Sequence, residues 1–136
     1  MIKSAVRKLI LENVTAASLL GSVRVFPSRL PSKYVLPSVV LTTISTMPQK
    51  ANSGHSGRVT ITDIQVTILA GSEEQMISLE REIIDALDLQ NTDVVLGATT
   101  VSILASFLED AQDLQGYEYE KEDEIVRTID FSFIWR

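Results

Sequence analysis

The sequence predicts an α+β domain in which a mostly antiparallel β-sheet carries two α-helices packed on one face. Two stretches have apolar residues at helical spacing, and each is followed by segments rich in β-branched residues. The links between the strand segments are too short for the repeated crossovers of a parallel sheet. A length of 136 residues fits a single domain spanning residues 1–136.

The N-terminal segment has the pattern of an amphipathic helix. Its apolar residues recur at spacings of three and four, and Gly21 is a natural end for such a helix. These apolar residues are Val6, Leu9, Ile10, Val14, Ala17 and Leu20. We therefore expect one helix that ends at Gly21.

A short β-type run, VRVF at residues 23–26, follows that helix. Three prolines within residues 27–37 then exclude a regular helix or a central strand there, so we expect an extended loop. Residues 38–46 (SVVLTTIST) are rich in β-branched residues and predict a strand. Residues 47–57 (MPQKANSGHSG) predict a flexible loop.

Residues 58–70 predict the next strand. Polar and apolar residues alternate along it, but the phase of the alternation changes near Asp63, which predicts a β-bulge. The apolar residues are Val59 and Ile61 before that point, and Ile64, Val66 and Ile68 after it.

The second helix is predicted over residues 72–89. Ser72 and Gln75 have the spacing of a capping box, and Glu73 and Glu74 fall in the first turn, where the helix dipole favours negative charge. An apolar stripe follows, made of Met76, Leu79, Ile83, Ile84 and Leu87.

Residues 99–110 and residues 124–135 predict the last two strands. In the final strand one face is apolar apart from Arg127, and it consists of Ile125, Ile129, Phe131, Phe133 and Trp135. Aromatic residues in such a strand belong more often to a core than to a ligand pocket. Two interpretations of Trp135 stay open, because a large amphipathic side chain near the end of a chain can pack in the core or anchor an interface.

The composition argues against several classes of function. The chain has no cysteine, which excludes disulfides, zinc–thiolate sites and iron–sulfur clusters. A net charge of −6 argues against general nucleic-acid binding, which depends on Lys and Arg. No apolar run approaches the ~20 residues of a membrane span, and Glu12 and Asn13 interrupt any signal-peptide core. We expect a soluble protein with no membrane partner.

A search for catalytic motifs finds little support for an enzyme. The one histidine, His55, lies in the glycine-rich stretch NSGHSG, where nothing would hold partners rigidly around it. The sequence contains no G-x-S-x-G elbow and no phosphate-binding glycine loop. We predict no catalytic, cofactor-binding or metal-binding residues and no cofactor.

An acidic run precedes the final strand, and it consists of Glu118, Glu120, Glu122, Asp123 and Glu124. Such a run can be a metal site, a catalytic pair or a solvated segment. Its spacing fits neither a calcium loop nor a two-helix carboxylate site. We favour a solvated segment that also discourages unwanted pairing of the terminal strand.

The order of the segments is also informative. A helix closed by Gly21 leads into VRVFPSRLPSKYVLPSVVLTTIS, with a valine-rich strand, spaced prolines and a second strand. SGRVTITDIQVTILAGSEEQMISLEREIIDAL then joins an alternating strand to a helix, and an acidic segment, an arginine and IDFSFIW close the chain. Over nearly its whole length, the chain resembles the tail-completion or tail-terminator proteins of long-tailed bacteriophages.

The resemblance implies a subunit of a homo-oligomeric ring, commonly a hexamer, on the head-proximal end of the tail tube in the virion. Assembled in the host cytoplasm, such a ring stops tube polymerisation and offers an attachment surface to the head. A tube stops growing when a ring matches it on one face and presents no copy of that face on the other. The implied partners are the tail-tube protein and a head–tail connector or neck protein, with DNA passing through without specific binding.

On this interpretation, the loop at residues 47–57 orders against the tube, and acidic residues line the hole of the ring. The acidic candidates are residues 118–124, or Glu73 and Glu74. One alternative is a head–tail connector or neck protein. A less favoured alternative is a small enzyme or ligand-binding domain, which would need a deep pocket with convergent polar groups.

Overall fold

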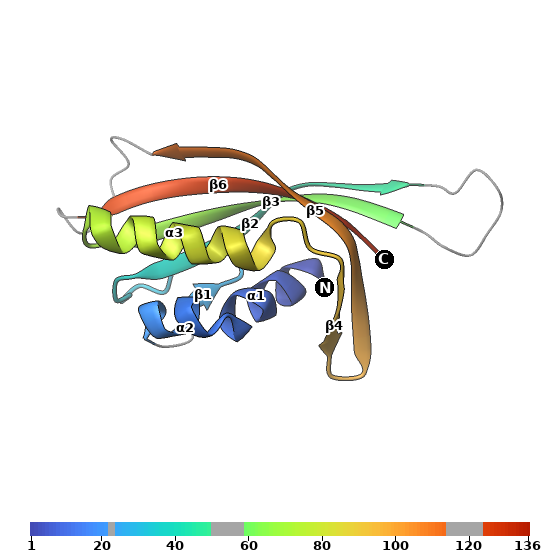
Figure 1. Ribbon diagram of the computed structural model, residues 1–136, viewed down its shortest axis with the longest axis horizontal. Helices are drawn as coiled ribbons and strands as arrows, with labels where there is room; N and C mark the ends of the chain where they lie inside the picture. Colours follow the sequence, from blue (N-terminus) through green and yellow to red (C-terminus); the bar gives the residue numbers. More distant parts are fainter. Residues whose placement is uncertain (22–23, 50–58, 114–123) are drawn as a thin grey trace.

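The computed structural model describes residues 1–21, 24–49, 59–113 and 124–136, which form three helices and a six-stranded sheet (Figure 1). The elements are α1 (Ile2–Glu12), α2 (Val14–Leu20), β1 (Val25–Phe26), β2 (Ser38–Gln49), β3 (Val59–Ala70), α3 (Glu73–Leu87), β4 (Thr92–Leu96), β5 (Thr99–Asp113) and β6 (Ile125–Trp135). The strand order is β1-β2-β3-β6-β5-β4. The α+β class is confirmed, but the sheet is mixed, because β1 pairs with β2 in parallel while the other four pairings are antiparallel.

The N-terminal helix is divided into two, which corrects the prediction of one helix. Asn13 has an extended backbone (φ −71°, ψ 109°) that interrupts the helical path. Its side-chain oxygen accepts a hydrogen bond from the Ala16 N–H at 3.0 Å and so caps α2. Its amide donates to the Glu82 carbonyl of α3 at 3.4 Å. The predicted end is confirmed, because Gly21 has a φ of 71° and closes α2.

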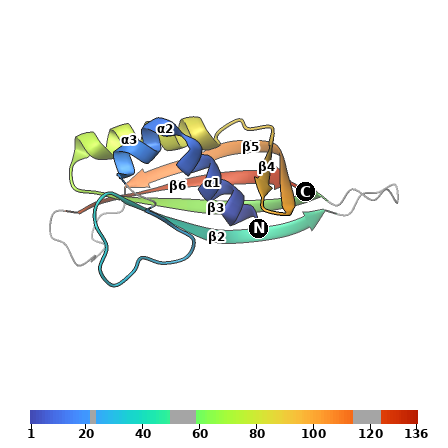
Figure 2. The same ribbon diagram turned by 90° about the horizontal axis from the view of Figure 1, so that it is seen from below.

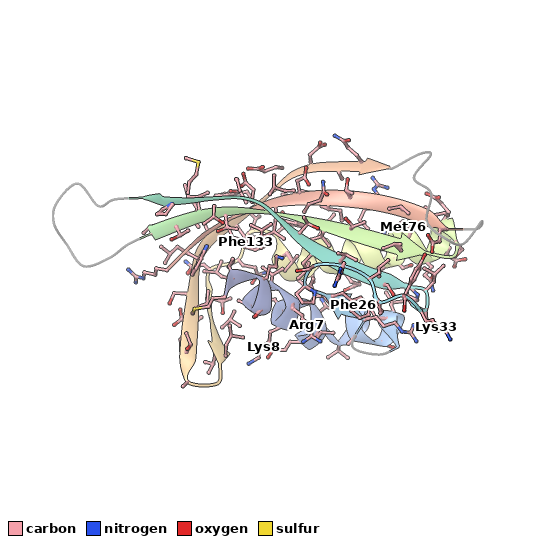
Figure 3. All side chains as sticks on the ribbon, turned by 180° about the vertical axis from the view of Figure 1, so that it is seen from behind. Arg7, Lys8, Phe26, Lys33, Met76 and Phe133 are labelled. Atoms are coloured by element: carbon pink, nitrogen blue, oxygen red, sulfur yellow. The ribbon has the colours of Figure 1, made fainter. Side chains whose placement is uncertain are left out.

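The three helices lie on the same face of the sheet (Figure 2). Their buried residues share one core with alternate residues of the central strands β3 and β6. From the strands this core includes Ile64, Val66, Ile68, Ile129, Phe131 and Phe133. The positions of Met76 on α3 and Phe133 on β6 can be followed in Figure 3. We call this side of the sheet the helix-covered face and the other side the helix-free face.

A second, smaller apolar cluster lies on the helix-free face. Residues 27–37, between β1 and β2, pass beneath one end of the sheet (Figure 2). Tyr34 from this connection is buried with Leu69 of β3 and Val126 of β6, and Leu30 and Leu36 pack against them. This connection therefore covers part of the helix-free face.

The β-bulge predicted near Asp63 lies on the partner strand instead. The register between β2 and β3 shifts at Ile44, which is opposite the predicted position, and β3 itself is regular. Because side chains alternate along a regular strand, Val59 and Ile61 are on the helix-free face while Ile64 is on the helix-covered face. The apolar positions change phase near Asp63 because the apolar side chains before it are on the helix-free face and those after it are on the helix-covered face.

The remaining boundaries differ by a few residues. β2 continues to Gln49, so the predicted loop at residues 47–57 begins later, and residues 50–58 lie outside the described residues. β5 continues to Asp113, three residues beyond its predicted end. β4 was not predicted, and it joins β5 through a turn in which Gly97 has a φ of 61°.

α3 confirms the second predicted helix. The Ser72 hydroxyl accepts a hydrogen bond from the Gln75 N–H at 3.2 Å, as a capping box requires. The Gln75 side chain reaches back to the N–H of Gly71 at 3.0 Å, one residue before the N-cap. The helix ends at Leu87, two residues earlier than predicted.

Candidate interaction surface

The residues predicted to have a functional role are dispersed. His55 and four of the acidic residues, those between 118 and 123, lie outside the described residues. Glu124 is half-buried and accepts a hydrogen bond from the Tyr34 hydroxyl, so it joins β6 to the connection beneath the sheet. Glu73 and Glu74 are exposed in the first turn of α3. The structure therefore brings none of the described acidic candidates together into one site.

Trp135 packs at the edge of the main core. Its ring is half-buried against that core, and its indole N–H donates to the Thr62 hydroxyl of β3 at 3.0 Å. Because the ring is only partly covered in the single chain, the packed interpretation and the interface-anchor interpretation of this residue both stay predictions.

In the part of the chain that the structure describes, no group of three or more His, Asp or Glu side chains is arranged to hold a metal ion. Across the same residues, no helix is both long and apolar enough to cross a membrane. The described surface has hollows, of which two are defined by their lining residues. One, of about 290 Å³, is lined by Ile77, Glu80, Arg81 and Ile84 on the outside of α3. The other, of about 180 Å³, lies between residues 89–91 and 104–107, and both are wide open to solvent.

The helix-free face carries a group of three carboxylates from neighbouring strands, Asp63 of β3, Asp130 of β6 and Glu109 of β5. Asp63 accepts a hydrogen bond from the Ser45 hydroxyl at 3.0 Å, and Asp130 accepts one from the Gln65 amide at 3.2 Å. Burial raises the pKa of Glu109, and the negative charges of Asp63 and Asp130 raise it further. Glu109 is thus close enough to Asp63 and Asp130 for their charges to disfavour its ionised form.

The sheet also has two long, partly open edges. Within the described chain, β1 pairs with only Val39 and Val40 of the 12-residue β2. On the opposite side, β4 pairs with residues 99–103 of β5, and among the described residues no strand pairs with the outer edge of residues 104–113. Open strand edges present backbone groups and side chains that can bind a partner.

Both open edges expose large apolar side chains. On β2, Ile44 and Met47 are 57% and 58% exposed. On β5, Phe107 and Leu108 are 45% and 38% exposed, and Leu89, beside this strand, is 75% exposed. The backbone N–H of Leu89 donates to the Ser106 carbonyl at 3.0 Å, which fixes that residue at the β5 edge.

Sequence reasoning missed these surfaces. Asp63 and Asp130 were visible only as polar positions that alternate with apolar ones, and nothing local indicated that Glu109 would lie beside them. The open edges depend on which strands pair over how many residues. A strand order was therefore needed before either surface could be recognised.

Of the comparisons with known proteins, the one with solved structures bears on the fold. No family model matches the chain, and no curated protein sequence matches it. The chain is similar to one in a solved structure described as "Virion of native gene transfer agent (GTA) particle", with a TM-score of 0.71 and 17% sequence identity. The match covers 98% of this chain and 92% of that chain. At this identity the likeness shows a shared fold over nearly the full length of both chains.

Proposed function

We propose that the chain is a structural protein of a phage-like particle and, within such a particle, a tail terminator. It forms a ring, commonly a hexamer, on the head-proximal end of the tail tube, stops tube polymerisation and provides the surface for head or neck attachment. The observation that carries this proposal is the fold shared with a virion chain over 98% of the length. The order of sequence segments, which resembles tail terminators, supports the finer assignment.

The proposed partners follow from the position of such a ring. One face binds the tail-tube protein, and the other binds a connector or neck protein. Termination is binding without turnover, so we propose that the protein is not an enzyme and uses no cofactor. The open strand edges give each subunit two separate surfaces through which a ring can form.

For the DNA passage, we propose that the helix-free face lines the hole. Asp63, Glu109 and Asp130 place negative charge on this face, which would keep DNA from adhering as it passes. Glu73 and Glu74 are in the helix layer instead, and Glu124 is bound to Tyr34. Replacement of Asp63 and Asp130 by lysine should leave ring formation intact and make the ring retain DNA. Rings that remain free of DNA would contradict this lining.

The deciding experiment measures native mass and tube length. The purified chain is analysed alone and after mixing with the tail-tube protein, and tube lengths are measured by electron microscopy. We expect a species near six subunits, alone or on the tube, and tubes that stop growing. A chain that stays monomeric with tube protein present, and leaves tube length unchanged, would overturn the proposal.

A head–tail connector or neck protein is the second candidate. The same fold match fits it, because the matched structure is a whole virion and its description gives no position within the particle. Binding of the tagged chain to tail-tube protein is compared with its binding to portal and connector proteins. A terminator captures tube protein, whereas a connector captures the portal side alone.

A further inference from the structure

The two halves of the chain carry opposite charge. Residues 1–58 contain eight Lys or Arg and one acidic residue, for a net charge of +7. Residues 59–136 contain four Lys or Arg and 17 acidic residues, for a net charge of −13, and the two halves together give the total of −6. The division falls between β2 and β3. The basic half therefore supplies the β1–β2 side of the sheet, and the acidic half supplies the β5 side.

Most of the described basic side chains gather around β1 and the connection that follows it. Arg7 of α1 donates to the Val25 carbonyl at 2.8 Å, and Lys3 donates to the Pro27 carbonyl at 2.6 Å. Arg29 and Lys33 are exposed in the same connection, and Lys33 is labelled in Figure 3. Carbonyl acceptors are neutral, so these contacts position the cations without cancelling their charge.

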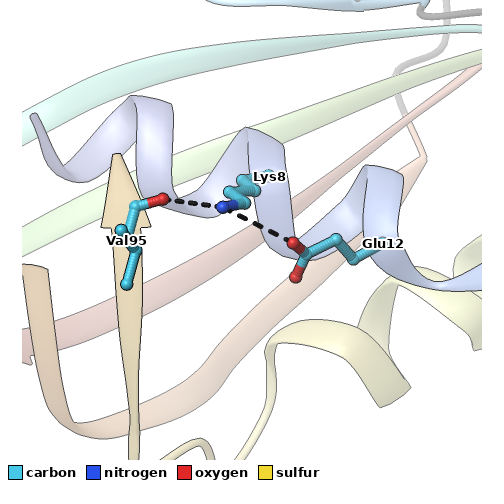
Figure 4. Close-up of polar contacts among 3 residues, drawn as sticks. All are labelled: Lys8, Glu12 and Val95. Atoms are coloured by element: carbon cyan, nitrogen blue, oxygen red, sulfur yellow. Dashed lines mark hydrogen bonds and ion pairs between the residues drawn. The ribbon is translucent and has the colours of Figure 1, made fainter. Parts of the chain in front are cut away.

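Among the described basic residues before β3, Lys8 is the exception, because it points to the other side of α1. Its ammonium donates to the Val95 carbonyl of β4 at 2.6 Å and forms an ion pair with Glu12 at 3.6 Å (Figure 4). The described residues contain one other ion pair, Arg127 with Glu80, and it is also remote from β1. The positive charge beside β1 is therefore not neutralised by any described residue.

The open edge of β5 has the opposite character. Asp88, at the end of α3, accepts a hydrogen bond from the Leu108 N–H at 2.8 Å. Asp110 accepts hydrogen bonds from the Ala111 N–H at 2.9 Å and the Gln112 amide at 2.5 Å. Glu109, the residue before Asp110 in β5, is exposed. All of these donors are uncharged, so the negative charge of this edge is retained.

Apolar and charged residues follow the same order along both edges. Strand pairing places Phe107 of β5 level with Ser45 of β2, next to the exposed Ile44. The same pairing places Asp110 level with Thr42, two residues beyond Val40, and Val39 and Val40 are the residues that pair with β1. From one end of the sheet to the other, the β2 side changes from apolar to basic and the β5 side from apolar to acidic. If the β2 side of one copy lies against the β5 side of a second copy in the same orientation, the apolar residues of the two edges face each other. The basic residues of one edge then face the acidic residues of the other.

We propose that the β2 side of one copy binds the β5 side of the next copy, in a head-to-tail contact. Contact between two identical edges would place like charges together, which costs several kcal/mol. A head-to-tail contact repeats and closes into a ring when its rotation allows. The inference deepens the proposed function, on whose ring it rests, by naming the subunit interface.

Side chains, rather than a continuous ladder of backbone hydrogen bonds between the two copies, specify this contact. On β2, the bulge at Ile44 interrupts the register, and Pro48 has no N–H to donate. On β5, Asp88 and Leu89 already bind the backbone at residues 108 and 106. Both features oppose indiscriminate strand pairing. The apolar patches and the charges therefore select the partner.

The test uses two complementary charge-reversed variants of the full chain. The first carries Arg29→Glu and Lys33→Glu, which makes both edges acidic. The second carries Glu109→Lys and Asp110→Lys, which makes both edges basic. Self-association is measured by sedimentation velocity, alone and with tube protein, after circular dichroism shows that each variant is folded. We expect each variant alone to associate roughly 100-fold more weakly than the wild type.

Mixing the two variants in equal amounts should restore assembly, with the two chains alternating around the ring. A charge-matched control carries Glu74→Lys and Asp85→Lys, which are exposed on α3 in the helix layer, and it should assemble as the wild type does. Variants that assemble normally alone, or a mixture that does not recover, would overturn the interface. If wild-type rings form but ignore the tube, the terminator function fails while the interface stands. A wild type that assembles under neither condition overturns both.

Discussion

The two faces of the sheet differ in what covers them. On β6, the helix-covered face holds Ile129, Phe131 and Phe133, each fully buried under the helices. The neighbouring residues Asp130 and Ser132 point to the helix-free face. Residues one position apart thus serve different purposes. The two-residue period of a strand therefore lets one face hold the fold together and leaves the other available for contacts.

The helix-free face is itself divided. At one end, Tyr34 and its neighbours close a small apolar cluster with Leu69 and Val126. Towards the middle of the sheet, Asp63 and Asp130 replace apolar residues. A single connection, residues 27–37, accounts for the difference, because it covers only one end. The uncovered part is the part that we assign to the DNA passage.

The largest expected effect tests the difference between the faces directly. Phe133→Ala removes a fully buried ring beside Phe131 and should lower the free energy of unfolding by about 3–5 kcal/mol. Ile134→Ala, at the next position on the helix-free face, truncates a half-buried side chain and should cost about 1 kcal/mol. Urea denaturation of both variants gives the two values. Equal losses would show that the two faces contribute alike.

A smaller effect is expected from Arg127, the polar exception on the helix-covered face. Its guanidinium forms an ion pair with Glu80 of α3 at 3.1 Å, and the two side chains are 26% and 14% exposed. Arg127→Met leaves the Glu80 carboxylate half-buried without this partner and should cost about 1–3 kcal/mol. The double variant with Glu80→Met should recover much of that loss, because the Glu80 carboxylate is then no longer buried without this partner. A double variant that is the least stable of the three would show that the pair is favourable in itself.

Much of the fold could be predicted because its elements carry local signals. α3 has a capping residue, Ser72, and a stripe of buried residues at helical spacing. β6 alternates apolar and polar residues along its length, and the helix-covered face follows directly from that pattern. Arg127 interrupts the pattern because it binds a helix residue 47 positions earlier in the chain, which no local signal shows.

The parts that escaped prediction depend on contacts between distant segments. The break at Asn13 interrupts a continuous apolar stripe, and it is supported by a contact with Glu82 of α3. β4 is five residues long and buries only Val94 well, so it has little pattern of its own. The three carboxylates of the helix-free face come together only because β3 pairs with β6 and β6 pairs with β5. The charge division was present in the sequence, but it acquires a meaning only when the strand order places the two halves at opposite edges.

A further test concerns the helix layer that makes the two faces unequal. Asn13→Ala removes the cap of α2 and the contact with Glu82, and it should cost about 1 kcal/mol in thermal unfolding. Ser72→Ala removes the equivalent cap of α3 and serves as a matched control with a similar loss. If Asn13→Ala is instead more stable than the wild type, α1 and α2 can join into the one helix that the sequence pattern predicts.

The smallest expected effect lies on the helix-free face, at Glu109. Burial and the charges of Asp63 and Asp130 raise the pKa of this carboxyl, so the folded state binds its proton more tightly than the unfolded state does. The ionised form therefore lowers stability at pH 7, and this cost disappears as the pH falls through the raised pKa. Glu109→Gln should then be more stable than the wild type at neutral pH, by no more than about 0.5 kcal/mol because the group is exposed.

The measurement for Glu109 is the difference in unfolding free energy between the variant and the wild type, followed from pH 7 to pH 4. The difference should shrink as the pH falls, because the wild-type carboxyl then becomes neutral as well. Asp93→Asn on β4 removes the same charge at a distance from the three carboxylates and gives the background effect of net charge. A Glu109→Gln variant that is less stable than the wild type at pH 7 would mean that this carboxylate is stabilised by its surroundings. The helix-free face would then hold its negative charge without internal repulsion, and the contrast with the helix-covered face would be one of polarity alone.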